Sequence, residues 1–535
     1  MNLKKLLKQV SKKKLLLAFV ILNLILNVIG ADFGLPSLWH PDELTHTVTR
    51  MLTTKTLNPG RFIYPSFYYY TLFFLNVPYS IYLLITGKTA LLMSDQSLKE
   101  VVISNVFLTS RIFTAFIGSL SIIMIYLIAK KISNERAAII SAGFGSVTMA
   151  IITYSHFATT DIPVTFMSLL SLYLILRLYE KPTTVNYILS GMSIGLATGT
   201  KYYAALLVIL LSFAHVLVNK KLVVNKSIFL AGISCVLAFF ISTPFAILDF
   251  QSFYRDTSVL QRTTMLVDNL YDPFPAFSYI FHLDNGLGTP LFILSLFGIA
   301  YCATIAMKNR KIMLVILWGV IYYGLISYRI HFSYLRYILP VVPILLIASG
   351  IFSDYILSIK NIKKPTTVLL ICIFLYTFSY AIKTDALFLN DSRYSSTDWV
   401  NENIPKNSKI LLFVSNNRYI PDLSEYNESL YYLNASTIKN FDSIKNSLEN
   451  IAPDYIIDSS LYYDRYLRFT NMYPRRSPLV KLVGYKTHEP GITEFYTKLF
   501  DGELGYILIK KIPEEKEDVP DPEFINPTIV IFKRD

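Results

Sequence analysis

Long runs of apolar residues alternate with short polar connections over residues 1–382. A helix needs ~20 apolar residues to cross the hydrocarbon core of a bilayer, and about eleven runs approach this length. They lie at residues 15–30, 112–129, 137–154, 163–178, 187–199, 202–218, 228–248, 290–307, 312–328, 337–356 and 366–382. The pattern predicts a polytopic α-helical membrane domain with about eleven transmembrane helices.

Basic residues recur at alternate connections between these runs, as is typical of cytoplasmic loops. Six lysines precede the first run. The later basic residues are Lys130, Lys131, Arg136, Lys181, Lys220, Lys221, Lys226, Lys308, Arg310, Lys311, Lys360, Lys363 and Lys364. We therefore expect a cytoplasmic N-terminus and interpret the first run as a retained span, since no small-residue cleavage site stands out before Asp32.

One aromatic-rich run, residues 64–86, would break this alternation if it crossed the membrane. It holds many Tyr and Phe residues, with Asn76 and Pro78 inside it. Such content suits a segment that lies at the membrane interface or re-enters the membrane. We place it within a large first outer loop that spans residues 31–110.

The hydropathy falls after Ile382, and residues 383–535 are predicted to form a soluble extracytoplasmic α/β domain. Strand-like runs lie at residues 410–414, 455–457, 506–509 and 528–532. Residues 513–527 are rich in Pro, Glu and Asp and are predicted to form a linker. The chain thus divides into a transmembrane domain, residues 1–382, and a soluble domain, residues 383–535.

The composition agrees with a membrane protein and argues against nucleic acid as a partner. Hydrophobic residues make up 53% of the chain and charged residues only 16%, which is too apolar for an ordinary soluble protein. The net charge of +13 is dispersed between apolar runs and forms no basic domain, so nucleic acid is not a predicted partner. The three cysteines fall in separate apolar runs, which does not suit a disulfide framework.

Two adjacent carboxylates follow the first span directly, in the sequence His40-Pro41-Asp42-Glu43. A carboxylate near an incoming hydroxyl can act as a general base and take its proton. Alternatively, Asp42 and Glu43 begin an interfacial helix, where negative charge in the first turn is favourable. The residues alone leave both interpretations open.

A second acidic residue, Asp161, lies between two later spans and on the same predicted face as Asp42. It could orient an acceptor or a metal ion beside Asp42. Alternatively, it caps the helix that begins near Pro163.

Several cations stand near the outer ends of predicted spans, where they could hold a phosphate leaving group. They are Arg111, Lys201, Arg329 and Arg336. The alternative for any one of them is a long side chain that reaches out to the interface. The segment from Arg329 to Arg336, which includes His331, is harder to explain this way because two arginines on an outer loop oppose the charge bias.

A divalent metal ion is a possible cofactor, and no other cofactor is predicted. His40, Glu43, His46 and His156 are candidate ligands, with Asp42 and His331 as further ones, although their spacing matches no dedicated metal motif. No nucleotide-binding or zinc-protease motif occurs in the sequence.

Together, several of these segments resemble the GT-C membrane glycosyltransferases, in the branch of the protein O-mannosyltransferases and the aminoarabinose transferases of lipid A. The segments that carry the resemblance are His40–Glu43, Tyr64–Tyr70, Thr160–Pro163, Gly195–Tyr202 and Arg336–Pro340. The resemblance extends over nearly the whole chain and implies a GT-C fold with juxtamembrane helices in the first loop. It also implies a lipid-phosphate-linked sugar donor and inversion at the anomeric carbon on the extracytoplasmic face.

The resemblance also implies roles for individual residues. Asp42 matches the first-loop acidic residue, the base, and is followed by Glu43 as in the mannosyltransferase-like members. Asp161 matches the second-loop acidic residue, and Arg336 matches an arginine that contacts the carrier phosphate, while Lys201 matches a lysine without an assigned role. Tyr64 departs from the aminoarabinose transferases, which carry a lysine there, and this departure argues against lipid A as the acceptor.

We therefore predict an inverting hexosyl- or pentosyltransferase in the plasma membrane, which moves a sugar from a polyprenyl-phosphate carrier to a hydroxyl of a glycan, lipid or protein. The predicted catalytic residues are Asp42, Glu43 and Asp161. The predicted substrate-binding residues are Arg336, Lys201, Arg329, Arg111, Tyr64 and His331. The alternatives are a transporter or flippase of lipid-linked sugars and a non-catalytic carrier-binding protein, but transporters usually show inverted repeats and midplane charges, whereas this sequence shows neither.

Overall fold

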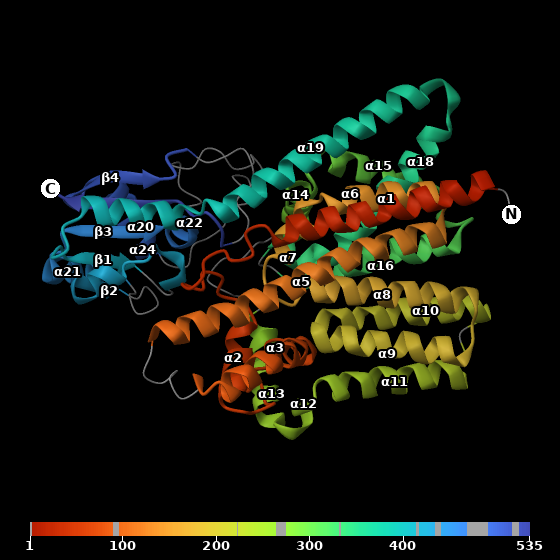
Figure 1. Ribbon diagram of the computed structural model, residues 1–535, viewed down its shortest axis with the longest axis horizontal. Helices are drawn as coiled ribbons and strands as arrows, with labels where there is room; N and C mark the ends of the chain where they lie inside the picture. The colour runs from red at the N-terminus through yellow and green to blue at the C-terminus, as the bar shows by residue number, and fades with distance from the viewer. Residues whose placement is uncertain are drawn as a thin grey trace. The chain divides into compact units, whose positions relative to one another are not determined.

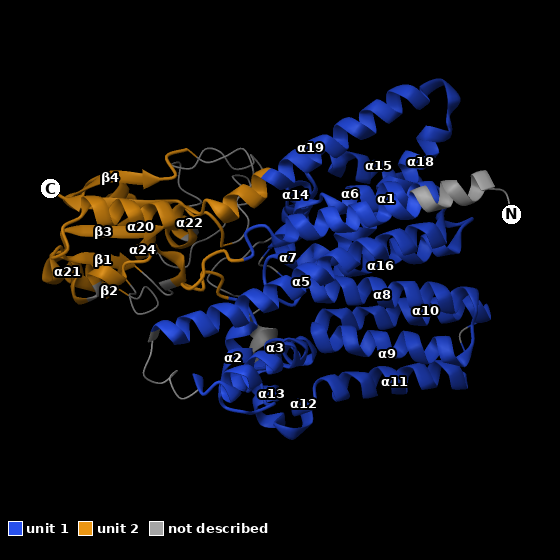
Figure 2. Ribbon diagram, viewed as in Figure 1, with its two compact units in different colours: residues 1–31, 42–264, 275–382 blue, residues 32–41, 265–274, 383–535 orange. Residues whose placement is uncertain are grey.

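A computed structural model describes residues 3–88, 96–221, 223–263, 274–330, 333–413, 417–433, 440–467, 490–515 and 524–535. The chain divides into two compact units (Figure 2). Unit 1 consists of residues 1–31, 42–264 and 275–382, and unit 2 of residues 32–41, 265–274 and 383–535. Asp32–Pro41, which the sequence places in the first outer loop, thus belongs to unit 2.

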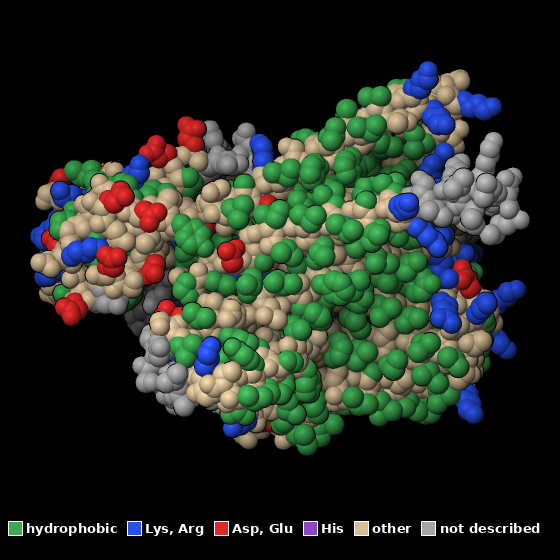
Figure 3. Space-filling view, viewed as in Figure 1, with side chains coloured by type: hydrophobic (Ala, Val, Ile, Leu, Met, Phe, Trp, Pro, Cys, Tyr) green, Lys and Arg blue, Asp and Glu red, His purple; other side chains and the backbone are tan. Residues whose placement is uncertain are grey.

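Unit 1 is built from helices that run mostly side by side (Figure 1). The long helices are α1 (Leu3–Val28), α5 (Gln96–Ile132), α6 (Glu135–Ser146), α8 (Asp161–Glu180), α9 (Thr184–Thr200), α10 (Leu207–Asn219), α11 (Lys226–Ser242), α15 (Thr289–Ala306), α16 (Arg310–Arg329), α18 (Val342–Ser358) and α19 (Lys363–Leu389). The other α-helices of unit 1 are α2 (Thr45–Thr53), α3 (Phe67–Ile85), α7 (Met149–Ser155), α12 (Phe245–Leu248), α13 (Phe250–Thr263), α14 (Pro275–Leu287) and α17 (Leu335–Ile338). Hydrophobic side chains cover the flank of these helices (Figure 3).

Within the described residues, seven helical segments are long and apolar enough to cross a membrane, or eight if the bent pair α6 and α7 forms one span. The predicted count of about eleven is therefore not confirmed. Helices α9 and α11 have 17 residues each, fewer than the ~20 that a crossing needs. In α1 the lysines extend to Lys14, which leaves only Leu15–Val28 as its apolar part. The aromatic helix α3 is not among the candidate spans.

Helices α9 and α11 pack closely because α9 presents a row of glycines to its neighbour. A Cβ atom at Gly191 would collide with the carbonyl oxygen of Ala231, and one at Gly195 with that of Cys235. Small residues in this spacing let helix backbones approach. The contact fixes the end of α9, which is followed directly by Lys201.

Unit 2 contains a five-stranded sheet with the order β2-β1-β3-β5-β4. The strands are β1 (Ile410–Phe413), β2 (Leu430–Leu433), β3 (Tyr455–Ser459), β4 (Tyr506–Ile512) and β5 (Ile529–Arg534). Strand β1 pairs in parallel with β2 and β3, while β5 pairs antiparallel with β3 and β4. The four predicted runs thus correspond to strands, and β2 is an additional one at the edge of the sheet.

Alternate residues of these strands face two separate cores, as expected for a sheet covered on both sides. Leu411, Ile456 and Phe532 belong to one core, which includes residues of α21 (Phe441–Ile451), α22 (Ser460–Leu467) and α24 (Pro490–Phe500). Ile410, Ile457 and Ile531 belong to the other, beside α20 (Ser392–Asn403). Much of the predicted 513–527 linker lies outside the described residues, but its end is packed, since Asn526 is only 6% exposed.

Candidate active site

A buried ion pair joins the start of α8 to the residue that follows α9. The Lys201 ammonium lies 2.6 Å from Oδ1 of Asp161, and both side chains are almost completely buried. Because only a short connection separates these antiparallel helices, the start of α8 and the end of α9 lie next to each other. The buried aspartate therefore has a partner of opposite charge supplied by the local topology.

A second ion pair joins Asp42 to Arg336, at a distance of 2.5 Å between Nη1 and Oδ2. Arg336 lies in the short helix α17, which leads into α18. The Asp42 side chain is 35% exposed, in contrast to 5% for Asp161. Asp42 is thus the carboxylate of the two that an incoming group can reach.

The ring of Tyr337 connects the two ion pairs. Its centroid lies 5.3 Å from the Lys201 ammonium and 5.3 Å from the guanidinium carbon of Arg336. Cations at this distance are attracted to the electron-rich face of an aromatic ring. Asp42, Asp161, Lys201, Arg336 and Tyr337 therefore form one group, which we call the charge cluster.

Tyr64 lies among the same side chains. Burial, followed by the negative charge of Asp42, raises the pKa of the Tyr64 hydroxyl well above its ordinary value. The charges of Arg336 and Asp161 also act on this hydroxyl. Tyr64 consequently stays neutral at physiological pH and can donate a hydrogen bond.

Glu43 and Arg111 form a fully buried clamp beside the cluster. The Arg111 guanidinium donates from Nε and Nη2 to the two carboxylate oxygens of Glu43, both at 2.8 Å. Glu43 also accepts the backbone N–H of Ala158 at 2.9 Å, and Arg111 donates to the carbonyl of Ala31 at 2.9 Å. The clamp thereby ties the residue after Asp42 to the segment before Asp161.

A family model of dolichyl-phosphate-mannose-protein mannosyltransferases matches residues 96–245, a range that includes Asp161 and Lys201. Comparison with curated proteins gives no match.

Two solved structures show where this arrangement of helices occurs elsewhere. ArnT from Cupriavidus metallidurans, bound to undecaprenyl phosphate, is similar with a TM-score of 0.53 and 12% identity, over 96% of this chain and 97% of that one. The archaeal oligosaccharyltransferase AglB from Archaeoglobus fulgidus, in complex with an inhibitory peptide and a dolichol-phosphate, has a TM-score of 0.52 and 14% identity, over 86% of this chain and 71% of that one.

The chain has the GT-C fold. The predicted fold class is thereby confirmed. With this fold and its long apolar helices, the chain is an integral membrane protein.

The structure brings only some of the predicted site residues together. Asp42, Asp161, Lys201, Arg336 and Tyr64 converge in the cluster. For Glu43 and Arg111, whose side chains are fully buried against each other, the geometry favours a structural role over the predicted catalytic and substrate-binding ones.

Two predicted residues are not part of the cluster as it is defined above. Arg329 is the last residue of α16, and among the described residues it forms no ion pair with Asp42 or Asp161. His331 lies outside the described residues. Tyr337 was given no role from the sequence, although it directly follows Arg336 in one of the segments that carry the GT-C resemblance.

The candidate metal ligands occupy separate environments. The His40 ring packs on Phe524 and the His46 ring on Phe107. The ring nitrogens of His156 lie 2.9 and 2.7 Å from the backbone carbonyl oxygens of Ile152 and Ile29. In the part of the chain that the structure describes, no three His, Cys, Asp or Glu side chains are placed to hold a metal ion. A bound divalent ion stays a prediction that the described side chains do not support by themselves.

Proposed function

We propose that the chain is an inverting glycosyltransferase that moves a sugar from a polyprenyl-phosphate carrier to an acceptor hydroxyl. The observation that carries this proposal is the charge cluster, in which one reachable carboxylate pairs with Arg336 near the neutral Tyr64 hydroxyl, and Lys201 supplies a second cation. The GT-C fold supports it, as do the undecaprenyl phosphate bound to ArnT and the dolichol-phosphate bound to AglB.

The cluster belongs on the extracytoplasmic face of the plasma membrane in this proposal. Lys and Arg side chains gather at one end of unit 1 (Figure 3). At this end Lys131 and Lys311 pair with Glu180, the last residue of α8. Asp161 begins the same helix of 20 residues, about 30 Å away. Since positive charge marks the cytoplasmic side, the opposite end of α8 faces outward.

Arg336 would bind the carrier phosphate. A phosphate oxygen offers the guanidinium the same kind of charge-assisted contact that the Asp42 carboxylate now provides. Binding of the carrier would therefore release Asp42 from its partner and leave the carboxylate available as a base. The carrier itself enters from the surrounding membrane lipids.

The reaction is a single displacement. An oxygen of the acceptor hydroxyl bonds to the anomeric carbon while its proton passes to the Asp42 carboxylate. The bond between the anomeric carbon and the phosphate oxygen breaks, and its electron pair stays on the phosphate. Arg336 and Lys201 stabilise the negative charge that develops there. Attack from the face opposite the leaving group inverts the configuration of the sugar.

Asp161 and Tyr64 have supporting roles in this scheme. Asp161 holds the Lys201 ammonium in place through the buried ion pair. The neutral Tyr64 hydroxyl donates a hydrogen bond to the sugar or the phosphate, at the position where aminoarabinose transferases carry a lysine. This difference favours acceptors other than lipid A.

The proposal is tested with purified protein and a panel of radiolabelled polyprenyl-phosphate hexoses and pentoses, with glycan, lipid and peptide acceptors. We expect release of the free carrier phosphate with at least one sugar, together with a product of inverted configuration. Movement of intact labelled carrier across vesicles, without release of the sugar, would contradict the proposal and establish the flippase alternative.

A further inference from the structure

The segment that connects α2 to α3 carries Tyr64 to the charge cluster, and two side chains hold the backbone of Phe62 within it. The Phe62 N–H donates to Oδ2 of Asp256 at 2.8 Å. The Phe62 carbonyl oxygen accepts the Tyr202 hydroxyl at 2.9 Å. Phe62 itself is completely buried. The chain is therefore held through both peptide groups of a buried residue, two positions before Tyr64.

Helix α13, which contains Asp256, packs against the same segment at several points. Phe253 and Asp256 are three positions apart, so they lie on the same side of this helix. The ring of Phe253 lies 5.7 Å from the ring of Phe62, edge to face. Asp249, directly before α13, accepts the side-chain amide of Asn58 at 2.8 Å. The start of α13 thus contacts the segment at both Asn58 and Phe62.

The two carboxylate oxygens of Asp256 have different partners. Oδ2 accepts the buried Phe62 N–H, while Oδ1 accepts Nε of Arg255 at 2.9 Å. The Asp256 side chain is 13% exposed and that of Arg255 is 63% exposed. A buried N–H without an acceptor is unfavourable, so loss of the carboxylate would favour movement of the Phe62 peptide group toward water. Loss of Arg255 would leave the Phe62 contact in place.

The second bond to Phe62 comes from the residue that directly follows Lys201. Tyr202 donates it, and the Lys201 ammonium pairs with Asp161 in the charge cluster. Phe62 therefore connects two parts of the chain that both lead into the cluster. Asp256 completes this connection from α13.

We propose that Asp256 is a positioning residue that acts through Tyr64, because it fixes the Phe62 peptide group two residues before it. This inference rests on the proposed function, in which the Tyr64 hydroxyl donates a hydrogen bond to the sugar or the phosphate. A misplacement of about 1 Å in an active site can lower the rate about 100-fold. A shift of the segment after loss of Asp256 would therefore slow the transfer, although Asp256 itself does not touch the substrate.

The first test is a double-mutant cycle between Asp256→Ala and Tyr64→Phe, measured as single-turnover transfer by the full-length protein. We expect Tyr64→Phe to lower the rate about 10- to 100-fold, as for the loss of one hydrogen bond to a charged group. Asp256→Ala should lower it about 10-fold. In the Tyr64→Phe background Asp256→Ala should have no further effect, because the hydroxyl that it positions is absent. Equal losses in both backgrounds would overturn the inference.

Two further variants separate the hydrogen bond to Phe62 from a general effect of α13. Asp256→Asn retains a side-chain oxygen that can accept the Phe62 N–H, so its rate should stay within about threefold of the wild type. Arg255→Ala is the matched control, because it removes the partner of Oδ1 and leaves Oδ2 in place. Its rate should equal that of the wild type. A loss from either variant as large as that from Asp256→Ala would contradict the proposal.

Hydrogen–deuterium exchange tests the contact without a donor sugar. Peptides that span residues 58–66 should exchange faster in Asp256→Ala than in the wild type, and at the wild-type rate in Arg255→Ala. Unchanged exchange in Asp256→Ala, or faster exchange throughout unit 1, would overturn the inference whatever the turnover. Faster exchange confined to residues 58–66, together with no transfer by the wild type from any polyprenyl-phosphate sugar, would instead overturn the proposed function and with it the role of Asp256 in transfer.

Discussion

Asp161 and Lys201 neutralise each other in a setting from which water is largely excluded, with 5% and 6% of their side chains exposed. Asp42 and Arg336 form the more open pair of the same charge cluster. The sequence indicated all four residues through short segments. It could not show which carboxylate forms an ion pair with which cation. That depends on helices whose ends meet only in the folded chain, since Asp42 and Arg336 are 294 positions apart.

Removal of one partner of the buried Asp161–Lys201 ion pair should destabilise the folded chain. Lys201→Ala leaves the Asp161 carboxylate buried without its cation, and we expect the free energy of unfolding to fall by about 3–5 kcal/mol. The double variant Lys201→Ala with Asp161→Asn should recover part of this loss, because the uncompensated charge is gone. Thermal unfolding in detergent measures the stability of the single and the double variant against that of the wild type. Equal melting temperatures for Lys201→Ala and the surface variant Lys510→Ala would show that the pair contributes nothing.

The buried carboxyl of Asp458, in the sheet of unit 2, should make the stability of this unit depend on pH. Burial raises the pKa of this carboxyl to about 8, although the hydrogen bond from Tyr496 opposes the shift. An unfolded aspartate has a pKa of about 3.9. Between these values the folded chain holds a proton that the unfolded chain has lost, so stability falls as the pH rises from about 4 to about 8.

Asp458→Asn removes this titration. The melting temperature of unit 2 should therefore decline less steeply between pH 5 and pH 8 in the variant than in the wild type. Identical slopes in both proteins would contradict the raised pKa.

At the scale of elements, the contact between α9 and α11 holds the end of α9 and with it Lys201. The spacing of Gly191, Gly195 and Gly199 in the sequence is typical of such a close contact. The number of membrane spans was harder to predict than this contact. Helices α9 and α11 have 17 residues each, so that their length alone does not decide whether they cross the membrane. The edge strand β2 was also missed, since it has only four residues and is partly exposed.

Gly195→Ala should disturb this contact, because its Cβ would press against the backbone of Cys235. Overpacking of this kind costs about 1–3 kcal/mol. Turnover should fall as well, since the end of α9 carries Lys201. Gly232→Ala on α11 is the matched control, because a Cβ there meets nothing within 4 Å. The explanation fails if the two variants have the same melting temperature and activity.

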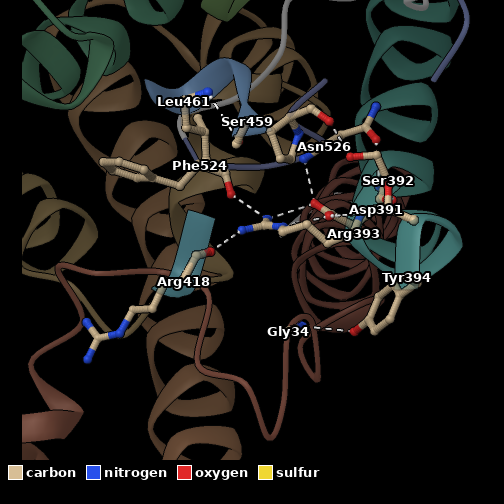
Figure 4. A network of polar contacts seen from close by, with 12 residues as sticks. Gly34, Asp391, Ser392, Arg393, Tyr394, Arg418, Ser459, Leu461, Phe524 and Asn526 are labelled. Carbon is tan, nitrogen blue, oxygen red and sulfur yellow. Dashed lines mark hydrogen bonds and ion pairs between the residues drawn. The ribbon is translucent and has the colours of Figure 1, made fainter. Parts of the chain in front are cut away.

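At the scale of the whole molecule, unit 1 holds the charge cluster, and unit 2 includes Asp32–Pro41 although residues 383–535 supply most of it. The point at which the chain enters unit 2 for its C-terminal stretch, Lys383, agrees with the fall in hydropathy after Ile382. The assignment of Asp32–Pro41 to unit 2 could not be predicted, because it rests on contacts such as that between Gly34 and Tyr394, 360 positions apart (Figure 4).

The clamp between Glu43 and Arg111 could not be predicted either, because these residues are 68 positions apart. The adjacent carboxylates of Asp42 and Glu43 differ in environment, since the Asp42 side chain is partly exposed and that of Glu43 is fully buried.

The most direct test of the central claim compares Asp42→Asn with Asp354→Asn in transfer from a radiolabelled polyprenyl-phosphate sugar. Asp354 is a matched control because it also forms an ion pair with an arginine of unit 1, Arg136. This pair lies outside the charge cluster. With Asp42 as the general base, Asp42→Asn should lower turnover about 100- to 10,000-fold while carrier binding persists, and Asp354→Asn should retain wild-type turnover. Equal turnover by the wild type and Asp42→Asn would contradict the account.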